Sequence, residues 1–263
     1  MLGLPDGVNT CLFDLDGVLT QTAKVHFAAW KQMFDEYLKQ RADSSGEESR
    51  EFTQDDYDKY VDGMPRYDGV QSFLGSRGIE LPRGESDDPP SAETVDGLGN
   101  RKNELVLKLI HDHGVEPYEG SVRYLHAVRD AGFHRAVVSS SANCKDVLEA
   151  AGIEDLLEVR MDGLVAERDH LKGKPAPDTY LKAAEMLDAK PEQCAVYEDA
   201  LAGVESGRAG NFGCVIGVDR VDQAEALKEH GADKVVEDLA ELLSTTTNDT
   251  SQFRGPKPPH QNQ

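Results

Sequence analysis

The stretch FDLDGVLTQT, residues 13–22, decides how this sequence is interpreted. It begins inside an apolar run, residues 8–15, that is typical of a buried β-strand. Two aspartates, Asp14 and Asp16, stand two positions apart at the end of this run, and Gly17 follows, where the chain can turn sharply. Because residues i and i+2 of a strand point to the same side, both carboxylates are predicted to face one site.

Short apolar runs alternate with helical patterns through most of the remaining chain. Further strands are predicted at residues 135–139, 194–198, 213–218 and 234–237. Helices are predicted at residues 121–131, 143–151, 178–187, 200–209 and 224–230. This alternation predicts an α/β fold with a Rossmann-like, doubly wound parallel sheet, whose ligands bind beyond the carboxyl ends of the strands.

A second pair of acids lies at the end of another predicted strand. Glu198 and Asp199 occur in CAVYEDALAG, residues 194–203, just before a helix. Together with Asp14 and Asp16 they would place four carboxylates at one edge of the sheet, where they would repel one another without a cation. Oxygen ligands of this kind suit Mg²⁺, which we therefore expect as the cofactor.

The alternation stops between residues 24 and 114. Helical patterns occur there at residues 25–37, 55–61, 67–76 and 101–113, and we expect the loop at 78–99 to be mobile. The sequence thus predicts an α/β catalytic core, formed by residues 1–23 and 115–243, with a small α-helical cap inserted at 24–114. Residues 244–263, rich in Thr, Asn, Gln and Pro, are predicted to be a disordered tail.

The composition excludes several classes of partner. Among 263 residues the formal net charge is −21, which argues against binding to nucleic acid or to an anionic membrane surface. No apolar stretch is long enough for a membrane span, and the first residues do not read as a leader peptide. No CxxC pair occurs among the four cysteines, which are Cys11, Cys144, Cys194 and Cys214, so we expect a cytoplasmic protein. We also expect a monomer.

Four motifs in this order carry a family resemblance. They are DLDGVLT, a strand that ends in Ser139, the lysine Lys174 of KGKPAPD, and YEDALAG. In these the chain resembles the haloacid dehalogenase (HAD) superfamily of phosphotransferases. The wording of three longer stretches is similar to the β-phosphoglucomutase subgroup: DLDGVLTQTAKVHFAAWK, GLGNRKNELVLKLI and KPAPDTYLKAAE. The resemblance extends over residues 8–243.

The residues themselves suggest the chemistry. One carboxylate can attack phosphorus to form an aspartyl-phosphate, while a second gives and takes the proton of the leaving or attacking oxygen. We assign Asp14 as the nucleophile and Asp16 as the general acid/base. Ser139 and Lys174 are expected to hold the transferred phosphoryl group. The resemblance implies that the metal is bound by Asp14, the main-chain carbonyl of Asp16, and the pair of acids Glu198 and Asp199.

The resemblance also assigns three residues of the predicted cap, and one residue just before it, to substrate binding. Arg66, in YVDGMPRYDG, matches an arginine that anchors the phosphate that is not transferred. His26 and Lys102 match residues that couple substrate binding to the placement of the acid/base, and Thr22 matches a threonine near the hinge. In one departure, the family's K-G-x-x-R has Asp62 in place of the lysine, which leaves the identity of the sugar open.

Three functions remain in view at this stage. Asp16 argues against a dehalogenase, which has no acid/base there, and against a transport ATPase, which carries threonine. The leading hypothesis is a β-phosphoglucomutase that converts β-glucose 1-phosphate to glucose 6-phosphate. A sugar-phosphate phosphatase, in which water attacks the aspartyl-phosphate, is the alternative. A non-catalytic phosphate-binding protein on the same fold is the third, although none of the expected catalytic residues is missing.

Overall fold

The computed structural model describes residues 2–46 and 49–243, and the predicted tail lies outside them. The chain divides into two compact units. One unit, which we call the core unit, is formed by Met1–Leu19 and Pro117–Gln263; the other, the inserted unit, is Thr20–Glu116. The predicted borders of core and cap, at 23/24 and 114/115, fall a few residues from these.

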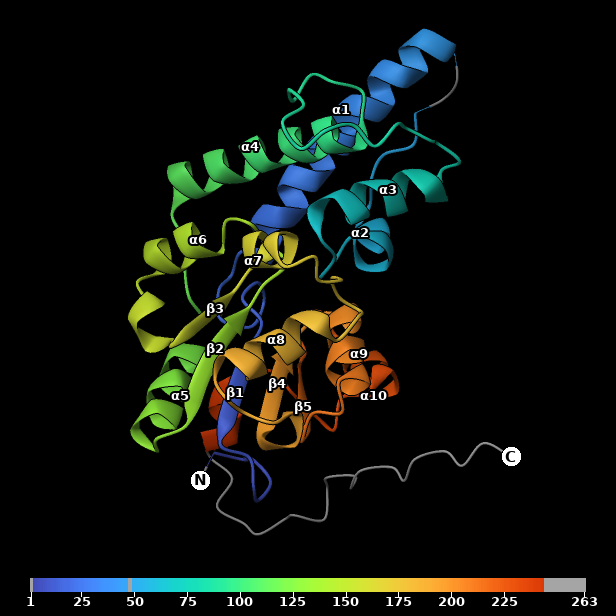
Figure 1. The fold of residues 1–263 in the computed structure, drawn as a ribbon. Coiled ribbons are helices and arrows are strands. Elements are labelled where there is room, and N and C mark those ends of the chain that lie inside the picture. Colours follow the sequence, from blue (N-terminus) through green and yellow to red (C-terminus); the bar gives the residue numbers. More distant parts are fainter. Residues whose placement is uncertain (1, 47–48, 244–263) are drawn as a thin grey trace, which may run out of the picture. The chain divides into compact units, whose positions relative to one another are not determined.

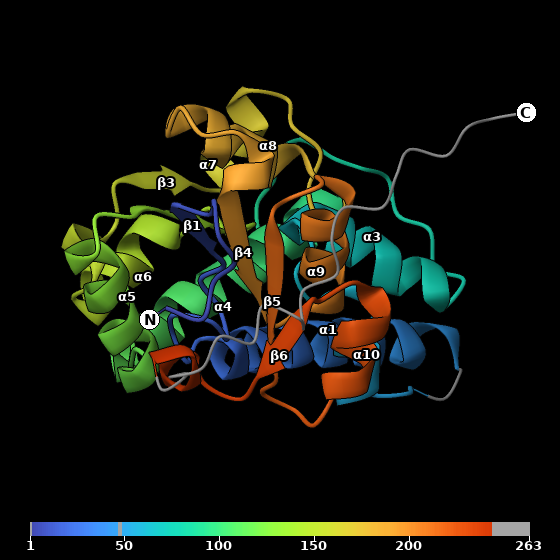
Figure 2. The same cartoon turned by 90° about the horizontal axis from the view of Figure 1, so that it is seen from below.

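A parallel sheet of six strands forms the centre of the core unit (Figure 1). The order is β3-β2-β1-β4-β5-β6, which is a doubly wound, Rossmann-like arrangement as predicted. β3 and β6 lie at opposite edges (Figure 2). The strands are β1 Thr10–Phe13, β2 His134–Val138, β3 Val159–Met161, β4 Cys194–Glu198, β5 Cys214–Val218 and β6 Lys234–Val236.

Helices connect these strands as parallel pairing requires. The α-helices of the core unit are α5 Glu119–Asp130, α6 Cys144–Ala151, α7 Gly163–Arg168, α8 Asp178–Met186, α9 Leu201–Ala209 and α10 Ala224–His230. Three short 3₁₀ helices complete the described part of the unit: η1 Glu154–Leu156, η2 Pro191–Gln193 and η3 Leu239–Leu243.

The two faces of the sheet bury different side chains. On one face Leu12, Val196 and Val215 share a register and pack with residues of α8, α9 and α10. On the other face Phe13 stacks on Tyr197 with ring centroids 4.4 Å apart, and Tyr124 of α5 packs edge-on against both rings. Because both faces are covered, the central strands β1, β4 and β5 are largely apolar, and polar side chains gather at the carboxyl ends of β1 and β4.

Two details differ from the sequence prediction. β1 ends at Phe13, so Asp14 and Asp16 lie just past the strand, although the N–H of Asp14 still donates to the carbonyl of Tyr197 at 2.9 Å. The edge strand β3 and the short helix α7 were not predicted. β3 has only three residues and carries Arg160 in its middle, so it shows no apolar run.

The described residues of the inserted unit, 20–46 and 49–116, form four helices (Figure 1). They are α1 Ala23–Ser45, α2 Gln54–Tyr60, α3 Arg66–Ser76 and α4 Val95–His113. Their shared core includes the aromatic residues Trp30, Phe34 and Phe73. The rings of Trp30 and Phe34 stack with their centroids 5.2 Å apart, so these aromatic residues of α1 pack inside the unit.

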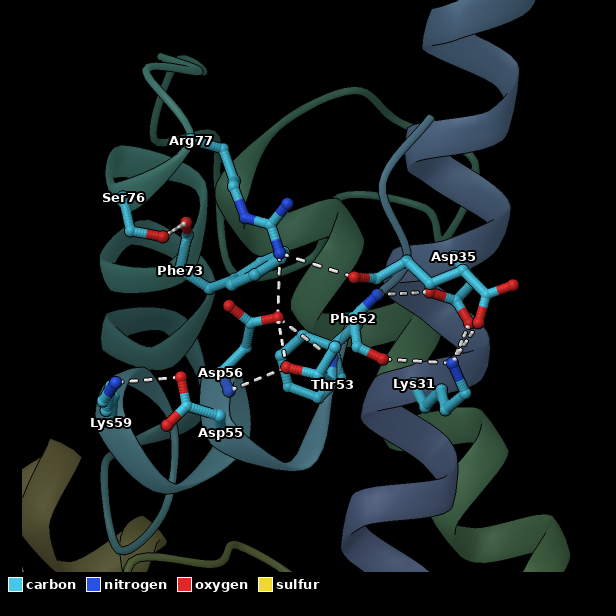
Figure 3. Close-up of polar contacts among 11 residues, drawn as sticks. Lys31, Asp35, Phe52, Thr53, Asp55, Asp56, Lys59, Phe73, Ser76 and Arg77 are labelled. Carbon is cyan, nitrogen blue, oxygen red and sulfur yellow. Dashed lines mark hydrogen bonds and ion pairs between the residues drawn. The ribbon is translucent and has the colours of Figure 1, made fainter. Parts of the chain in front are cut away.

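Polar contacts fasten α2 to its neighbours (Figure 3). Thr53 and Asp56 form a capping box at the start of α2, and Arg77 donates to the same Asp56 carboxylate at 2.8 Å. Asp35 of α1 accepts the N–H of Phe52 at 2.7 Å. These contacts hold Phe52 and Thr53, which lead into α2, against α1 on one side and the end of α3 on the other.

The loop before α4, which we expected to be mobile, is tied to that helix. Asn100 donates to the carbonyls of Ser86 and Asp88, and Arg101 donates to the carbonyl of Pro90 at 2.7 Å. The helix itself begins at Val95, earlier than predicted, because Thr94 caps it. In residues 2–46 and 49–243, no helix combines the length and the apolar character needed to cross a membrane.

Candidate active site

The carboxyl edge of the sheet gathers the acids of the first and fourth strands. Asp14 follows β1, Glu198 is the last residue of β4, and Asp199 comes next. One carboxylate oxygen from each of the three lies within 4.8 Å of the others. β1 and β4 are neighbours in the sheet, which explains why residues 184 positions apart meet here.

A buried lysine joins this cluster. The ammonium of Lys174 donates to Asp14 and lies 2.5 Å from a carboxylate oxygen of Glu198. The Lys174 side chain is only 1% exposed. Burial disfavours its charge, but the two carboxylates outweigh that effect and raise its pKa above the ordinary value, so Lys174 remains a cation.

The charges in this cluster are not balanced. One ammonium stands against three carboxylates, of which Asp14 and Glu198 are buried. Burial raises the pKa of the Asp14 carboxyl, and although Lys174 opposes this shift, the neighbouring acids add to it. A divalent cation among these oxygens would remove the repulsion, and a set of oxygen donors alone fits such a hard ion.

Glu198 is oriented by groups that the sequence did not single out. The hydroxyl of Tyr180 in α8 donates to Glu198 at 2.8 Å. Burial and the charge of Glu198 raise the pKa of Tyr180, so the hydroxyl keeps its proton and acts as donor. A Cβ at Gly203 would overlap the Glu198 carboxylate, so only glycine fits at that position of α9.

The remaining predicted residues of the core lie beside the cluster. Asp16 is close enough to affect the charge of Asp14, and Ser139 follows β2, the neighbour of β1 on the other side. Ser139 is buried and its hydroxyl accepts the N–H of Ser141 at 3.1 Å. Lys174 also donates to the carbonyl of Val138 at 3.3 Å, which brings the segment of Ser139 to the same lysine.

The residues predicted to bind substrate lie in the inserted unit. His26 of α1 and Lys102 of α4 are both buried, with His26 Nδ1 and Lys102 Nζ 2.8 Å apart. Thr22 directly precedes α1, and its hydroxyl lies 2.8 Å from that of Thr20. Arg66 begins α3 and donates to the Tyr67 hydroxyl at 2.9 Å. The structure thus pairs His26 with Lys102 and places Arg66 on another helix.

Functional residues that the sequence did not predict share one property. The hydroxyl of Tyr180 and the space at Gly203 matter only because Glu198 lies against them. Both stand in stretches already quoted, KPAPDTYLKAAE and YEDALAG. A glycine inside a helical pattern is a usable signal of close approach, whereas a buried tyrosine has no such mark.

The three acids and the buried lysine at the carboxyl edge of this sheet are the groups that an enzyme of phosphoryl transfer beside a divalent cation would need. A family model described as haloacid dehalogenase-like hydrolase matches residues 8–211. The chain therefore belongs to the haloacid dehalogenase-like hydrolase family, as the sequence predicted.

Named relatives narrow the comparison. The chain is 56% identical over 247 residues to the β-phosphoglucomutase of Mycobacterium tuberculosis, an alignment that spans 92% of this chain and 94% of the relative. It is 29% identical over 245 residues to the β-phosphoglucomutase of Bacillus subtilis, over 92% and 96% of the two chains. Among solved structures, β-phosphoglucomutase from Clostridium difficile has a TM-score of 0.71 and 25% identity, covering 89% and 93%.

Proposed function

We propose that this enzyme is a β-phosphoglucomutase, which moves a phosphoryl group between C1 and C6 of β-glucose phosphate. The observation that carries the proposal is the identity of 56% over 92% of the chain with a relative of that name. The alternative, a phosphatase, would share the acidic edge of the core unit. It would differ in letting water reach the aspartyl-phosphate.

The residues of the core unit are proposed to act in two half-reactions. The cycle begins with Asp14 already phosphorylated. The C6 hydroxyl of β-glucose 1-phosphate attacks the phosphorus of the aspartyl-phosphate, the bond from phosphorus to Asp14 breaks, and Asp16 takes the proton of the hydroxyl, which gives the bisphosphate. In the second half, Asp14 attacks the phosphorus at C1, the bond from phosphorus to the C1 oxygen breaks, and Asp16 gives that oxygen a proton, which leaves glucose 6-phosphate and phosphorylated Asp14.

Two further residues are proposed to hold the phosphoryl group. Lys174 already lies against Asp14, so it would stay beside the phosphoryl oxygens when Asp14 is phosphorylated. The hydroxyl of Ser139 would donate a hydrogen bond to the same group. Mg²⁺ would be held by Asp14, Glu198, Asp199 and the main-chain carbonyl of Asp16. When bound, it would neutralise negative charge on the carboxylates and the phosphoryl oxygens.

The inserted unit is proposed to be the cap that selects the substrate. Arg66 would bind the phosphate that is not transferred, as its charge and bidentate geometry favour. The contact of 2.8 Å between His26 and Lys102 supports a joint role for these two residues, and Thr22 lies one turn before His26. We further propose that the enzyme works in the cytoplasm, which its four free, buried cysteines support, and that it is a monomer.

A phosphorus NMR time course tests the function. The full chain is incubated with β-glucose 1-phosphate, Mg²⁺ and a trace of glucose 1,6-bisphosphate, with Asp14→Asn as the control. Conversion to glucose 6-phosphate without inorganic phosphate is expected. Inorganic phosphate as the main product, absent in the control, would instead make the enzyme a phosphatase.

A further inference from the structure

The loop between β5 and α10 touches both acidic segments of the core unit. Arg220 in this loop reaches the chain just after Asp16, and Gln223 reaches the main chain at Asp199. We propose that Arg220 and Gln223 are positioning residues that hold the two acidic segments at the spacing the chemistry needs. The proposal rests on the proposed function, because it concerns the same acidic edge.

Four contacts fix the guanidinium group of Arg220. Its Nε donates to the carbonyl of Gly17 at 2.7 Å, and Nη1 donates to the carbonyl of Glu237, also at 2.7 Å. Nη1 also lies 3.7 Å from a carboxylate oxygen of Asp238. The group stacks on Tyr118, with its central carbon 3.6 Å from the ring centroid. The Arg220 side chain is 15% exposed. A planar group bound at both an edge and a face has little freedom, so the carbonyl of Gly17 is held by a rigid partner.

The carbonyl of Gly17 matters because of its neighbours in the chain. Gly17 has a φ of +82°, and a Cβ there would overlap the carboxylate of Asp199. The segment after Asp16 therefore packs directly against the second acidic segment. A rotation of the peptide at Gly17 would move Asp16 relative to both Asp14 and Asp199.

Gln223 holds the second acidic segment from the same loop. Its Nε2 donates to the carbonyl of Asp199 at 2.9 Å. The loop is itself rigid, because the side chain of Asp219 accepts three of its N–H groups. These belong to Val221, Gln223 and Ala224, at 3.2, 2.8 and 3.1 Å. One rigid loop thus donates a hydrogen bond to one main-chain carbonyl in each acidic segment.

The hydrogen bonds from Arg220 and Gln223 to these two carbonyls, which we call the clamp, oppose electrostatic repulsion within the site. The carboxylates at this edge repel one another, and the repulsion pushes the two segments apart whenever the charge is not compensated. A displacement of about 1 Å at reacting groups can cost roughly 10²-fold in rate. Fixing both segments through their main-chain carbonyls keeps the spacing without placing another charge against the carboxylates themselves.

The test compares two arginines of similar burial in the core unit. Arg220→Met removes the clamp. Arg135→Met is the control, because Arg135 is 12% exposed and donates to the carbonyl of Leu156 at 2.9 Å, but at the amino end of β2. We expect Arg220→Met to lower kcat by about 10²-fold and to weaken Mg²⁺ binding by about tenfold in calorimetry. KM should change little, and the control should match the wild type in kcat and Mg²⁺ affinity.

Two further variants separate positioning from a general loss of folding. Arg220→Lys keeps the charge and can reach one carbonyl, so it should recover part of kcat. Gln223→Leu should also lower kcat and Mg²⁺ affinity, and combined with Arg220→Met it should cost less than the two single losses together, since both act through one spacing. If Arg220→Met is not folded, Gln223→Leu against the control decides the question.

The outcomes also distinguish this proposal from the proposed function. If the wild type released phosphate rather than forming glucose 6-phosphate, the mutase would be wrong, yet the Mg²⁺ affinities of the variants would still test the clamp. If Arg220→Met and Gln223→Leu matched Arg135→Met in both kcat and Mg²⁺ affinity, the clamp would be wrong whatever the reaction.

Discussion

Two buried carboxylates, Asp56 in the inserted unit and Asp14 in the core unit, meet a cation in opposite ways. Asp56 forms an ion pair with Arg77 and also accepts hydrogen bonds from the N–H and hydroxyl of Thr53. Burial opposes its charge, but Thr53 and Arg77 outweigh that effect and hold its pKa below the usual value. Asp14 shares Lys174 with Glu198, and burial raises its pKa.

The difference separates a structural ion pair from a reactive site. In the pair of Asp56 and Arg77, one negative charge meets one positive charge, and the carboxylate is hydrogen-bonded. The pair therefore stabilises the packing of α2 against the end of α3 (Figure 3). The cluster around Asp14 has surplus negative charge, which costs folding energy and is retained where chemistry needs it. Variants that act on one region should therefore change activity, and variants in the other should change stability.

The largest effect is expected from Asp14→Asn. The amide cannot attack phosphorus, so kcat should fall by at least about 10⁴-fold. Because the variant removes one of the repelling acids, the free energy of unfolding without metal should fall by no more than about 1 kcal/mol. Steady-state kinetics and urea denaturation measure the two quantities. A variant with more than a tenth of wild-type activity would exclude Asp14 as the nucleophile.

Arg77→Met should show the reverse pattern. It leaves the Asp56 carboxylate buried without its cation, which costs about 3 kcal/mol of unfolding free energy. Under conditions where the protein stays folded, kcat should stay within about threefold of the wild type. Lys59→Met is the matched control, because Lys59 and Asp55 form an exposed pair whose loss should leave the unfolding free energy nearly unchanged. Equal losses in both variants would refute the structural role of Arg77.

The same pair predicts a dependence on pH. Because the pKa of Asp56 is held below its usual value of about 3.9 in the folded state, the pair stabilises the fold above that pH. This stability is lost as the pH falls through the lower, folded-state pKa. The difference between Arg77→Met and the wild type should accordingly shrink below about pH 4. A constant difference from pH 7 to pH 3 would contradict this account.

Addition of Mg²⁺ should stabilise the wild type by about 2.7 kcal/mol when its concentration is about 100 times the dissociation constant. Thermal unfolding in the presence and absence of Mg²⁺ measures this effect. Asp199→Asn should lose most of the shift, since it removes one ligand of the cluster. Arg77→Met should keep the shift in full, and its loss there would show that the two regions are not independent.

The smallest effect compares two buried tyrosines of the core unit. Tyr180→Phe removes a donor to Glu198, and Tyr124→Phe removes hydrogen bonds to Tyr197 and to the carbonyl of Leu2. Each should cost about 1 kcal/mol of stability. Only Tyr180→Phe should weaken Mg²⁺ binding, by about tenfold in calorimetry. Similar Mg²⁺ affinities in the two variants would remove Tyr180 from the support of the site.

The sequence predicted the parts of the fold that depend on local pattern. Residues 194–198 are uniformly apolar before Glu198 and were predicted with the bounds of β4, and the helix at 224–230 matched α10. β3 was not predicted, because a strand of three residues with a central arginine has no periodicity to detect. The converging acids were predictable, because acids at the ends of parallel strands must meet at one edge.

Residues that act through distant contacts could not be predicted in this way. Arg220 lies 203 positions from Gly17, and its sequence neighbourhood, VDRVDQ, resembles any polar loop. Gln223 and Tyr180 are likewise defined by what they touch in the folded chain. Their roles follow from pairing of distant segments, on which local propensity carries no information.

The two connections between the core unit and the inserted unit bear on how such proteins evolve. The N–H of Tyr118 donates to the carbonyl of Leu19 at 2.9 Å, and within the inserted unit the N–H of Gln21 donates to the carbonyl of Glu116 at 2.9 Å. In each unit, the two points at which the chain passes to the other unit therefore lie side by side. An exchange of residues 20–116 for another module, or for a short linker, would require no rerouting of the sheet. The hydrogen-bonded junction thus allows the inserted unit to be exchanged as a whole during evolution.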